Sequence, residues 1–119
     1  MASTPTLQGQ TFTVTQITDI LKNVIESSFR GICVEGEISN ITSSGPGHLY
    51  LTLKDQTAQI SCAMFRNAAQ YLASRPKTGD KVRCFGSLSV YPPRGNYQLI
   101  ITKMEIAGVG DILLMLNQR

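Results

Sequence analysis

The hydrophobic pattern of this chain changes from a helical to a strand-like period at Gly31, and no other feature restricts its fold as strongly. Before Gly31, apolar side chains recur at the i, i+3, i+4, i+7 and i+8 positions of an amphipathic helix. These side chains are Ile17, Ile20, Leu21, Val24 and Ile25. Thr15 is the predicted N-cap, and Gly31 is predicted to end the helix. The apolar face of this helix is expected to rest on the sheet that follows.

After Gly31, the sequence contains five strand-like segments, most of which alternate apolar and polar residues as half-buried strands do. The five segments are 32–41, 48–55, 58–65, 81–91 and 97–106. Gly36 and Gly86 stand inside the first and the fourth, and each predicts a bend or a bulge. The alternation of the fifth segment is blurred, so the sequence does not assign its faces.

A short helix is predicted between the third and fourth strands, over residues 66–75. Ala, Gln and Leu favour a helix there, and Pro76 ends it. The expected fold is therefore mainly β, with an N-terminal helix, five strands, and a short helix between strands 3 and 4. This order matches the five-stranded barrel of the OB-fold. Closing the barrel also removes the exposed edges that so short a sheet would otherwise have.

The 119 residues are enough for one domain and little more. We expect the OB-fold nucleic-acid-binding domain to occupy residues 12–107. Residues 1–11 lack the basic start and apolar core of a secretory signal, so a disordered lead is expected. Residues 108–119 contain glycine and the apolar run "DILLML", and we expect a linker or helix start that leads into a further domain. No apolar run approaches the ~20 residues that cross a bilayer.

The three cysteines predict the compartment in which the protein acts. Cys33, Cys62 and Cys84 are odd in number, contain no CxxC pair, and lie in strand-like segments. Free, buried thiols are expected rather than disulfides or a zinc site. Together with the missing secretory signal, this predicts a location in the reducing cytoplasm.

The charge is distributed unevenly along the chain. Residues 1–55 carry three basic and five acidic groups, whereas residues 56–119 carry eight basic and three acidic groups. From Arg66 to Arg94 there are six basic residues and one acid, Asp80. A segment of this kind suits a polyanion, although scattered surface cations would give the same count.

Aromatic and cationic residues interleave on the strand faces that are expected to point outward. Flat rings can stack on bases and Arg or Lys can neutralise phosphates, so this mixture predicts binding of single-stranded nucleic acid. The candidate residues are His48, Tyr50, Lys54, Phe65, Arg66, Arg83, Phe85, Tyr91, Arg94 and Tyr97. The alternative for any one ring is packing beneath a helix, because Tyr and Phe are common in strands. If Phe85, Tyr91 and the apolar tail are exposed, assembly with other protein domains is a second hypothesis.

Catalytic hypotheses have little support in this sequence. His48 is the only histidine, and no Ser or Cys stands in a nucleophile-elbow context. Glu35 and Glu37 share a strand face and could hold a cation, but the remaining acids are isolated. The stretch "SSGPG" lacks the lysine and the following Ser or Thr of a P-loop. No catalytic residue, metal site or cofactor is predicted.

Several motifs, taken together, resemble one known family. "VEGEISNITSSGPGHLYLTLKD", "ISCAMFR" and "SVYPPRGNYQL" are similar to the N-terminal domain of the large subunit of bacterial exodeoxyribonuclease VII. The resemblance runs from Phe12 to Ile106, and the motifs are specific in combination. Leu51 departs from the pattern, because many members have an aromatic residue there.

The resemblance implies an OB-fold that binds single-stranded DNA. It also implies a parent enzyme that degrades single-stranded DNA exonucleolytically from both ends into oligonucleotides. In the best-known members this enzyme needs no divalent metal, and it assembles with a small subunit. The nuclease chemistry of the family belongs to a following domain, so this chain alone is expected to bind DNA without cutting it.

Overall fold

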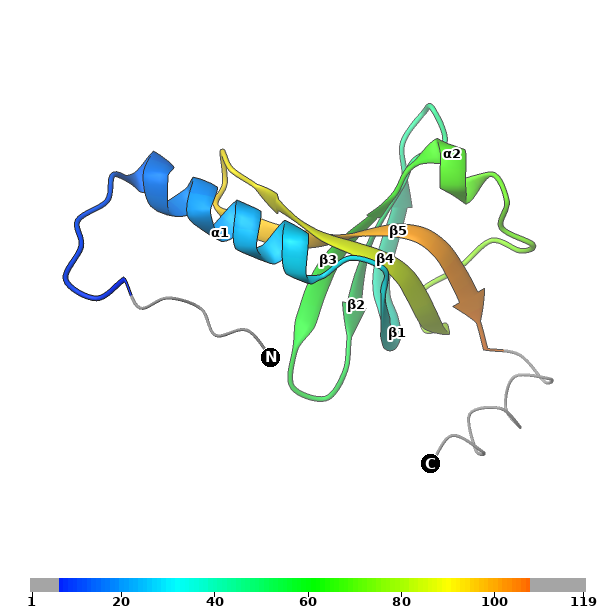
Figure 1. Cartoon of the computed structure of the whole chain (residues 1–119). Coiled ribbons are helices and arrows are strands. Elements are labelled where there is room, and N and C mark those ends of the chain that lie inside the picture. The colour runs from blue at the N-terminus through cyan, green and yellow to red at the C-terminus, as the bar shows by residue number, and fades with distance from the viewer. Residues whose placement is uncertain (1–6, 108–119) are drawn as a thin grey trace.

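The strand-like segments pair edge to edge until the sheet closes on itself (Figure 1). The computed structural model describes residues 7–107. The elements in chain order are α1 (Val14–Ser28), β1 (Ile32–Ser43), β2 (Leu49–Lys54), β3 (Gln59–Met64), α2 (Arg66–Ala69), β4 (Lys81–Tyr91) and β5 (Asn96–Ile106). The strand order around the barrel is β1-β2-β3-β5-β4, and every pair is antiparallel except β3 with β5. The predicted five-stranded barrel is confirmed, with its N-terminal helix and its short helix between strands 3 and 4.

Some predictions concern residues beyond this description. Of the predicted lead, only residues 7–11 are described, and the predicted linker over 108–119 lies outside the described residues. Within residues 7–107, no helix is long and apolar enough to cross a membrane.

The alternating apolar side chains fill the barrel as predicted. Leu49, Leu51 and Leu53 of β2 are each at most 5% exposed. Other strands add Ile38, Cys62, Met64, Val82, Cys84, Leu99, Ile101 and Met104 to the same cluster. Leu51, which departs from the family pattern, therefore packs in the core, and the departure changes no outward ring.

Two bulges shift the pairing register of the strands, and only one of them lies at a glycine for which the sequence predicts a bend or a bulge. In β4 the register shifts between Phe85 and Gly86, and a Cβ on Gly86 would overlap the carbonyl oxygen of Ile100. On β5 the register skips Thr102, which explains the blurred alternation of that strand. In β1 the shift lies between Ile38 and Asn40, so the bulge is not at Gly36, where the sequence predicted either a bend or a bulge.

Helix α1 begins two residues earlier than predicted. Thr13 is the N-cap: its Oγ1 accepts a hydrogen bond from the backbone N of Gln16 (3.1 Å), and its own backbone N donates to Oε1 of Gln16 (2.9 Å). This reciprocal capping box needs Glu or Gln three residues after the cap. Thr15 is followed at that distance by Thr18, so the prediction of Thr15 was wrong.

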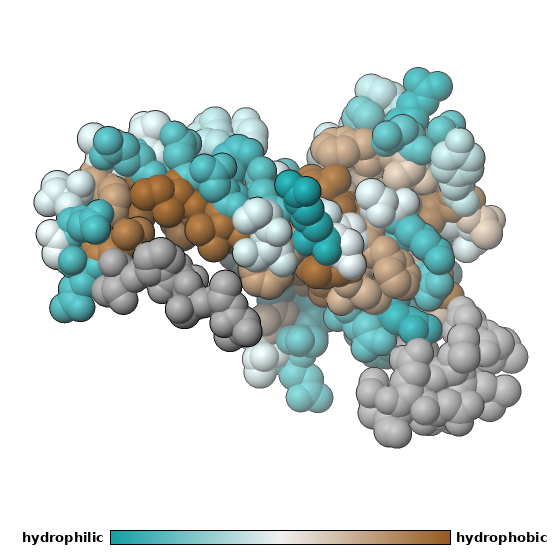
Figure 2. Space-filling model, viewed as in Figure 1, coloured by the Kyte–Doolittle hydropathy of each residue, from teal (hydrophilic) through white to brown (hydrophobic). Residues whose placement is uncertain are grey.

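The apolar face of α1 rests only partly on the barrel. Glu26 attaches the helix to β4, because its Oε2 accepts hydrogen bonds from Ser89 Oγ and from the backbone N of Val90, both at 3.1 Å. No residue of α1 is buried, and Leu21 and Val24 are 50% and 42% exposed. Figure 2 shows the resulting apolar stripe along the helix. The expectation that the sheet covers this face was wrong for most of its length.

Helix α2 is shorter than predicted and closes one end of the barrel. It spans only Arg66–Ala69, after which Tyr71 and Leu72 make tighter i to i+3 hydrogen bonds, and the chain continues without helix to the buried Pro76. Ala68, Ala69 and Leu72 pack against the core. The predicted helix over 66–75 was therefore too long.

Candidate nucleic-acid interface

The strand register determines which residues share the outside of the barrel. Tyr50 of β2 pairs with Ala63 of β3, Ala63 pairs with Ile100 of β5, and Ile100 pairs with Ser87 of β4. Residues paired in this way share one face of a sheet. We call these four residues the outer row. None of the four is charged. Tyr50 is 43% exposed, whereas Ala63 is 1% exposed, and Ser87 and Ile100 line a cleft together with Glu26 and Arg30, so the row presents its ring at the Tyr50 end.

Three of the predicted aromatic residues gather at the α2 end of this row. His48 precedes Tyr50 by two residues and Phe65 follows Ala63 by two, so strand alternation directs them to the same side. The His48 and Phe65 rings meet edge to face, with centroids 5.4 Å apart at 88°. Phe65 is 38% exposed. We call His48, Tyr50 and Phe65 the aromatic group.

His48 holds two segments of the chain together. The loop before it turns at Gly47, whose φ is +101°, and Ser44 donates its backbone N–H to the carbonyl of His48 (2.9 Å). The Nδ1 atom of His48 accepts a hydrogen bond from the backbone N of Arg66 (2.9 Å). Since Nδ1 is an acceptor, the ring proton of the neutral form is on Nε2. His48 thus positions the start of α2, and Nε2–H is the ring N–H that remains to donate to a ligand.

Arg66 follows the aromatic group, and the fold brings a second arginine close to it. Arg75 lines a cleft of about 290 Å³ together with Arg66, and its Nη2 donates to Ser43 Oγ at 2.6 Å. The sequence prediction did not include Arg75. Its position next to Pro76 in the basic segment was a signal, but only the folded chain shows that it faces the 44–47 loop.

The β4–β5 hairpin separates the residues predicted at its tip. Tyr91 pairs with Asn96, whereas Tyr97 pairs with Val90, whose side chain is buried in the barrel. Tyr91 and Tyr97 therefore point to opposite faces of the hairpin, although they are 48% and 53% exposed. The Arg94 side chain is exposed in the turn between them.

Tyr97 instead lies near Lys54. The two residues line a cleft of about 190 Å³ whose lining also includes the acidic residues Glu35 and Asp55. Tyr97 and Lys54, which were both predicted as site residues, thus line one cleft although they belong to different hairpins, and this cleft lies at the end of the barrel away from α2.

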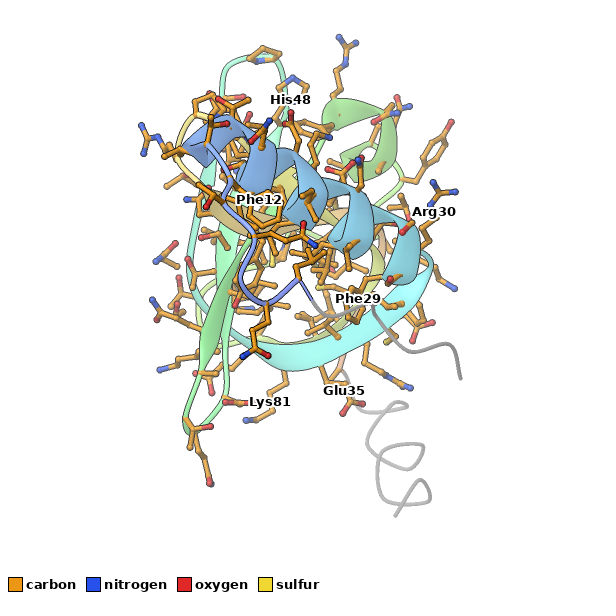
Figure 3. The ribbon with its side chains drawn as sticks, turned by 60° about the vertical axis from the view of Figure 1, so that its left-hand side comes forward. Phe12, Phe29, Arg30, Glu35, His48 and Lys81 are labelled. Carbon is orange, nitrogen blue, oxygen red and sulfur yellow. The ribbon has the colours of Figure 1, made fainter. Side chains whose placement is uncertain are left out.

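The remaining predicted cation, Arg83, lies among acids. On the outside of β1, β4 and β5, Arg83 contacts Glu35 (3.9 Å) and Glu105 (3.8 Å). We call the alternating charges here the charge ladder: Glu35, Glu37, Lys81, Arg83, Lys103 and Glu105. Phe85 lies within the ladder, half-buried, with Lys103 Nζ 5.2 Å from its ring centroid. Figure 3 shows Glu35 and Lys81 at the opposite end of the barrel from His48.

The groups that could support catalysis are dispersed or engaged. Glu37 contacts Lys81 at 3.6 Å, and within residues 7–107 no three His, Cys, Asp or Glu residues gather as a metal site would require. Burial raises the pKa of Cys62 to about 11 and that of Cys84 to about 12, so both thiols are neutral. The three cysteines are free, as predicted, but Cys33 is exposed, so its predicted burial was wrong.

A comparison with protein families matches residues 12–105 to the model described as OB-fold nucleic acid binding domain. The chain belongs to this family. Among curated proteins it is 43% identical over 99 residues to the exodeoxyribonuclease 7 large subunit of Helicobacter hepaticus, covering 83% of this chain and 24% of that protein. It is 46% identical over 101 residues to that of Thioalkalivibrio sulfidiphilus, covering 85% and 23%. The predicted resemblance is confirmed, and the OB-fold domain spans about a quarter of these relatives' length.

Solved structures share the fold at low sequence identity. One is a Replication Protein A heterotrimer bound to ssDNA, with a TM-score of 0.57 and 15% identity, covering 75% of this chain and 66% of that chain. Another is the S. pombe Stn1–Ten1 complex, with a TM-score of 0.56 and 20% identity, covering 76% and 68%. These similarities establish the barrel architecture independently of the sequence motifs.

Proposed function

We propose that this OB-fold domain binds single-stranded DNA across the outer row, with bases stacked on the aromatic group. The observation that carries the proposal is the aromatic group at the Tyr50 end of the outer row, with Arg66 directly after Phe65. Stacking on a side-chain ring contributes about 1–3 kcal/mol per base and needs bases that are not paired in a duplex. The surface therefore suits single strands better than duplexes.

A titration with fluorescent oligo-dT, alongside a duplex of the same length, tests this function. We expect the single strand to bind more tightly, and its affinity to fall as salt rises because phosphate contacts release counterions. The measurement is fluorescence anisotropy at two salt concentrations. Equal affinity for both ligands, or no binding up to high micromolar concentrations, would contradict the proposal.

The relatives named exodeoxyribonuclease 7 large subunit suggest the wider role. We infer that the chain is the DNA-binding part of an exonuclease that degrades single-stranded DNA from both ends and assembles with a small subunit. The three free thiols fit the reducing cytoplasm, which is the location we propose.

In this role the chain itself binds DNA and does not cut it. Incubating the purified chain with labelled single strands in magnesium, manganese or a chelator tests that point, and no cleavage is expected. Cleavage that disappears in the His48→Ala variant would contradict it.

The exposed apolar stripe of α1 favours a second candidate function, assembly with other protein domains. Val14 at the start of the helix is 82% exposed, and Leu21 and Val24 are exposed further along it. Light scattering of the unsubstituted chain and of a Leu21→Ser, Val24→Ser double variant would reveal assembly through this face. Under this hypothesis Arg66→Gln leaves assembly unchanged.

A further inference from the structure

Arg66 and Arg75 line the same cleft at the α2 end of the barrel. The 44–47 loop, the end of α2 and the segment before β4 form this cleft, which has a volume of about 290 Å³. We call it the arginine cleft. Its apolar walls include Pro46, Leu49, Leu72 and Pro76.

Both arginines lack an acidic partner. Within residues 7–107, the ion pairs involve Lys22, Lys77, Lys81, Arg83 and Lys103, and neither Arg66 nor Arg75. No residue that lines the arginine cleft is acidic, and both arginine side chains are exposed. The cleft therefore combines two uncompensated positive charges with no competing carboxylate, which favours an anion.

The chain holds the guanidinium of Arg75 and the base of the Arg66 side chain without neutralising either charge. The Nη2 atom of Arg75 donates to the hydroxyl of Ser43 (2.6 Å), which leaves its other N–H groups for a ligand. The backbone N of Arg66 donates to His48, and a Cβ on Gly47 would lie only 3.6 Å from Cγ of Arg66. The aliphatic part of Arg66 therefore lies against the glycine turn. A guanidinium group can form paired hydrogen bonds with a phosphate, and that of Arg75 is already oriented by its bond to Ser43.

Arg66 connects the arginine cleft to the aromatic group. Phe65, whose ring meets that of His48 edge to face, directly precedes Arg66 in the chain. Neighbouring residues therefore supply a stacking surface and a candidate phosphate ligand. A strand whose bases stack on this group has a phosphate within reach of Arg66, because bases and phosphates alternate along it.

We propose that the arginine cleft is a phosphate-binding subsite, in which Arg66 and Arg75 hold a phosphate of a single strand that continues from the outer row around the 44–47 loop. This inference rests on the proposed binding of single-stranded DNA. It adds Arg75 to the predicted interface and defines where the strand leaves the sheet. The phosphate is either an internal phosphodiester or the terminal phosphate of a strand.

The test uses the shortest oligo-dT that binds with full affinity, so that the strand cannot shift its register. In the unsubstituted chain, a neutral methylphosphonate at one particular linkage should weaken binding about tenfold, which is the effect of losing one charged hydrogen-bonding contact. Arg75→Gln should weaken binding of the unmodified strand by a similar factor and should make that linkage insensitive to methylphosphonate. Its plot of log affinity against log salt should also be shallower by about 0.7 for the one phosphate lost.

Oligonucleotides with a 5′-phosphate, a 3′-phosphate or neither distinguish the two sources of the phosphate. A gain in affinity from one terminal phosphate that disappears in Arg75→Gln assigns the subsite to a strand end. Equal affinities for the three strands, together with one sensitive internal linkage, assign it to a phosphodiester.

Lys103→Gln is the matched control, because Lys103 already pairs with Glu105 at 3.4 Å. It should leave both the affinity and the salt dependence unchanged.

If Arg75→Gln loses stability with its bond to Ser43, the NMR signal of the Arg75 Nε–Hε group in the unsubstituted chain gives the same information. This signal should shift when the single strand is added. An Arg75 variant that binds like the unsubstituted chain, while Tyr50→Leu loses binding, would overturn the subsite and leave the proposed function standing. Failure of the unsubstituted chain to bind any single strand would overturn both.

Discussion

The outer row and the charge ladder are two parts of one barrel surface with opposite character. The row is neutral and ends at rings and unpaired arginines, whereas the ladder alternates acids and bases that pair across strands. Both arise from the same alternation of side chains along strands, and β4 and β5 contribute residues to each. A cation contributes to binding a polyanion only where no carboxylate already compensates it, so the number of cations in a sequence overestimates the binding surface.

The Gly86→Ala variant should have the largest effect, because Gly86 lies where the two regions meet. Its new Cβ would overlap the carbonyl oxygen of Ile100 in the outer row. We expect a loss of about 3 kcal/mol in the free energy of unfolding, the upper range for overpacking. Urea denaturation measures it. Gly45→Ala is the control, because a Cβ there meets nothing within 4 Å. Equal stabilities of the two variants would contradict the close approach of β4 and β5.

Replacing one ring in each region tests the division directly. Tyr50→Leu removes the exposed ring of the outer row, and we expect about tenfold weaker binding of oligo-dT, which is within the range for loss of one stacked base. Phe85→Leu removes the ring that Lys103 covers in the ladder. It should change the affinity less than twofold. Anisotropy titrations at a single salt concentration compare the two, and a larger loss for Phe85→Leu would reverse the assignment of the faces.

A smaller effect is expected when the charges of the ladder are changed. Arg83 lies between Glu35 and Glu105, so Arg83→Gln should weaken binding of single strands by less than twofold at moderate salt. Replacing both glutamates by glutamine should strengthen binding a few-fold at low salt, since it leaves Arg83 uncompensated. The salt dependence of both variants provides the measurement. A loss of tenfold or more in Arg83→Gln would place the strand on the ladder.

The smallest expected effect concerns pH and the attachment of α1 beside the row. Hydrogen bonds from Lys22 and then from the backbone of Val90 lower the pKa of Glu26 from its ordinary value of 4.5. A carboxyl whose pKa is lower in the folded state stabilises the fold above its unfolded pKa, and the contribution is lost as pH falls through the folded value. Stability should thus decrease more between neutral pH and pH values below 4.5 in the unsubstituted chain than in Glu26→Gln. Denaturation curves at several pH values measure the free energy of unfolding of both chains. Equal decreases in the two chains would show that Glu26 does not contribute to the pH dependence of stability.

The barrel was predictable because its evidence is local. Alternation placed Leu49, Leu51 and Leu53 on one side of a strand and Tyr50 on the other, and the order of helices and strands limited the topology. The error in the start of α1 also has a local cause. The sequence "TVTQ" offers two threonines as caps, and only the glutamine three residues after Thr13 favours the first.

The interface was less predictable because it depends on pairing between distant segments. Tyr97 looked like a neighbour of Tyr91, but its partner is Val90, and that register places it on the other face of the hairpin. Arg75 precedes a proline in an irregular segment, and no periodicity assigns it a direction. Arg83 looked like a free cation because its acidic partners come from other strands, which only the closed barrel brings together.

The parallel contact between β3 and β5 has a consequence for how the molecule opens. Only Cys62 with Leu99 and Ala63 with Ile100 are in register there, and the two segments are separated in the chain by α2 and all of β4. The β1–β4 contact joins segments still further apart but makes six register pairs, whereas this seam makes two, so this seam is expected to open first in native-state fluctuations. The outer row crosses the seam between Ala63 and Ile100. A DNA strand bound along the row would therefore stabilise the closed seam. Protection of the backbone amides at the seam from hydrogen exchange would then rise with DNA concentration.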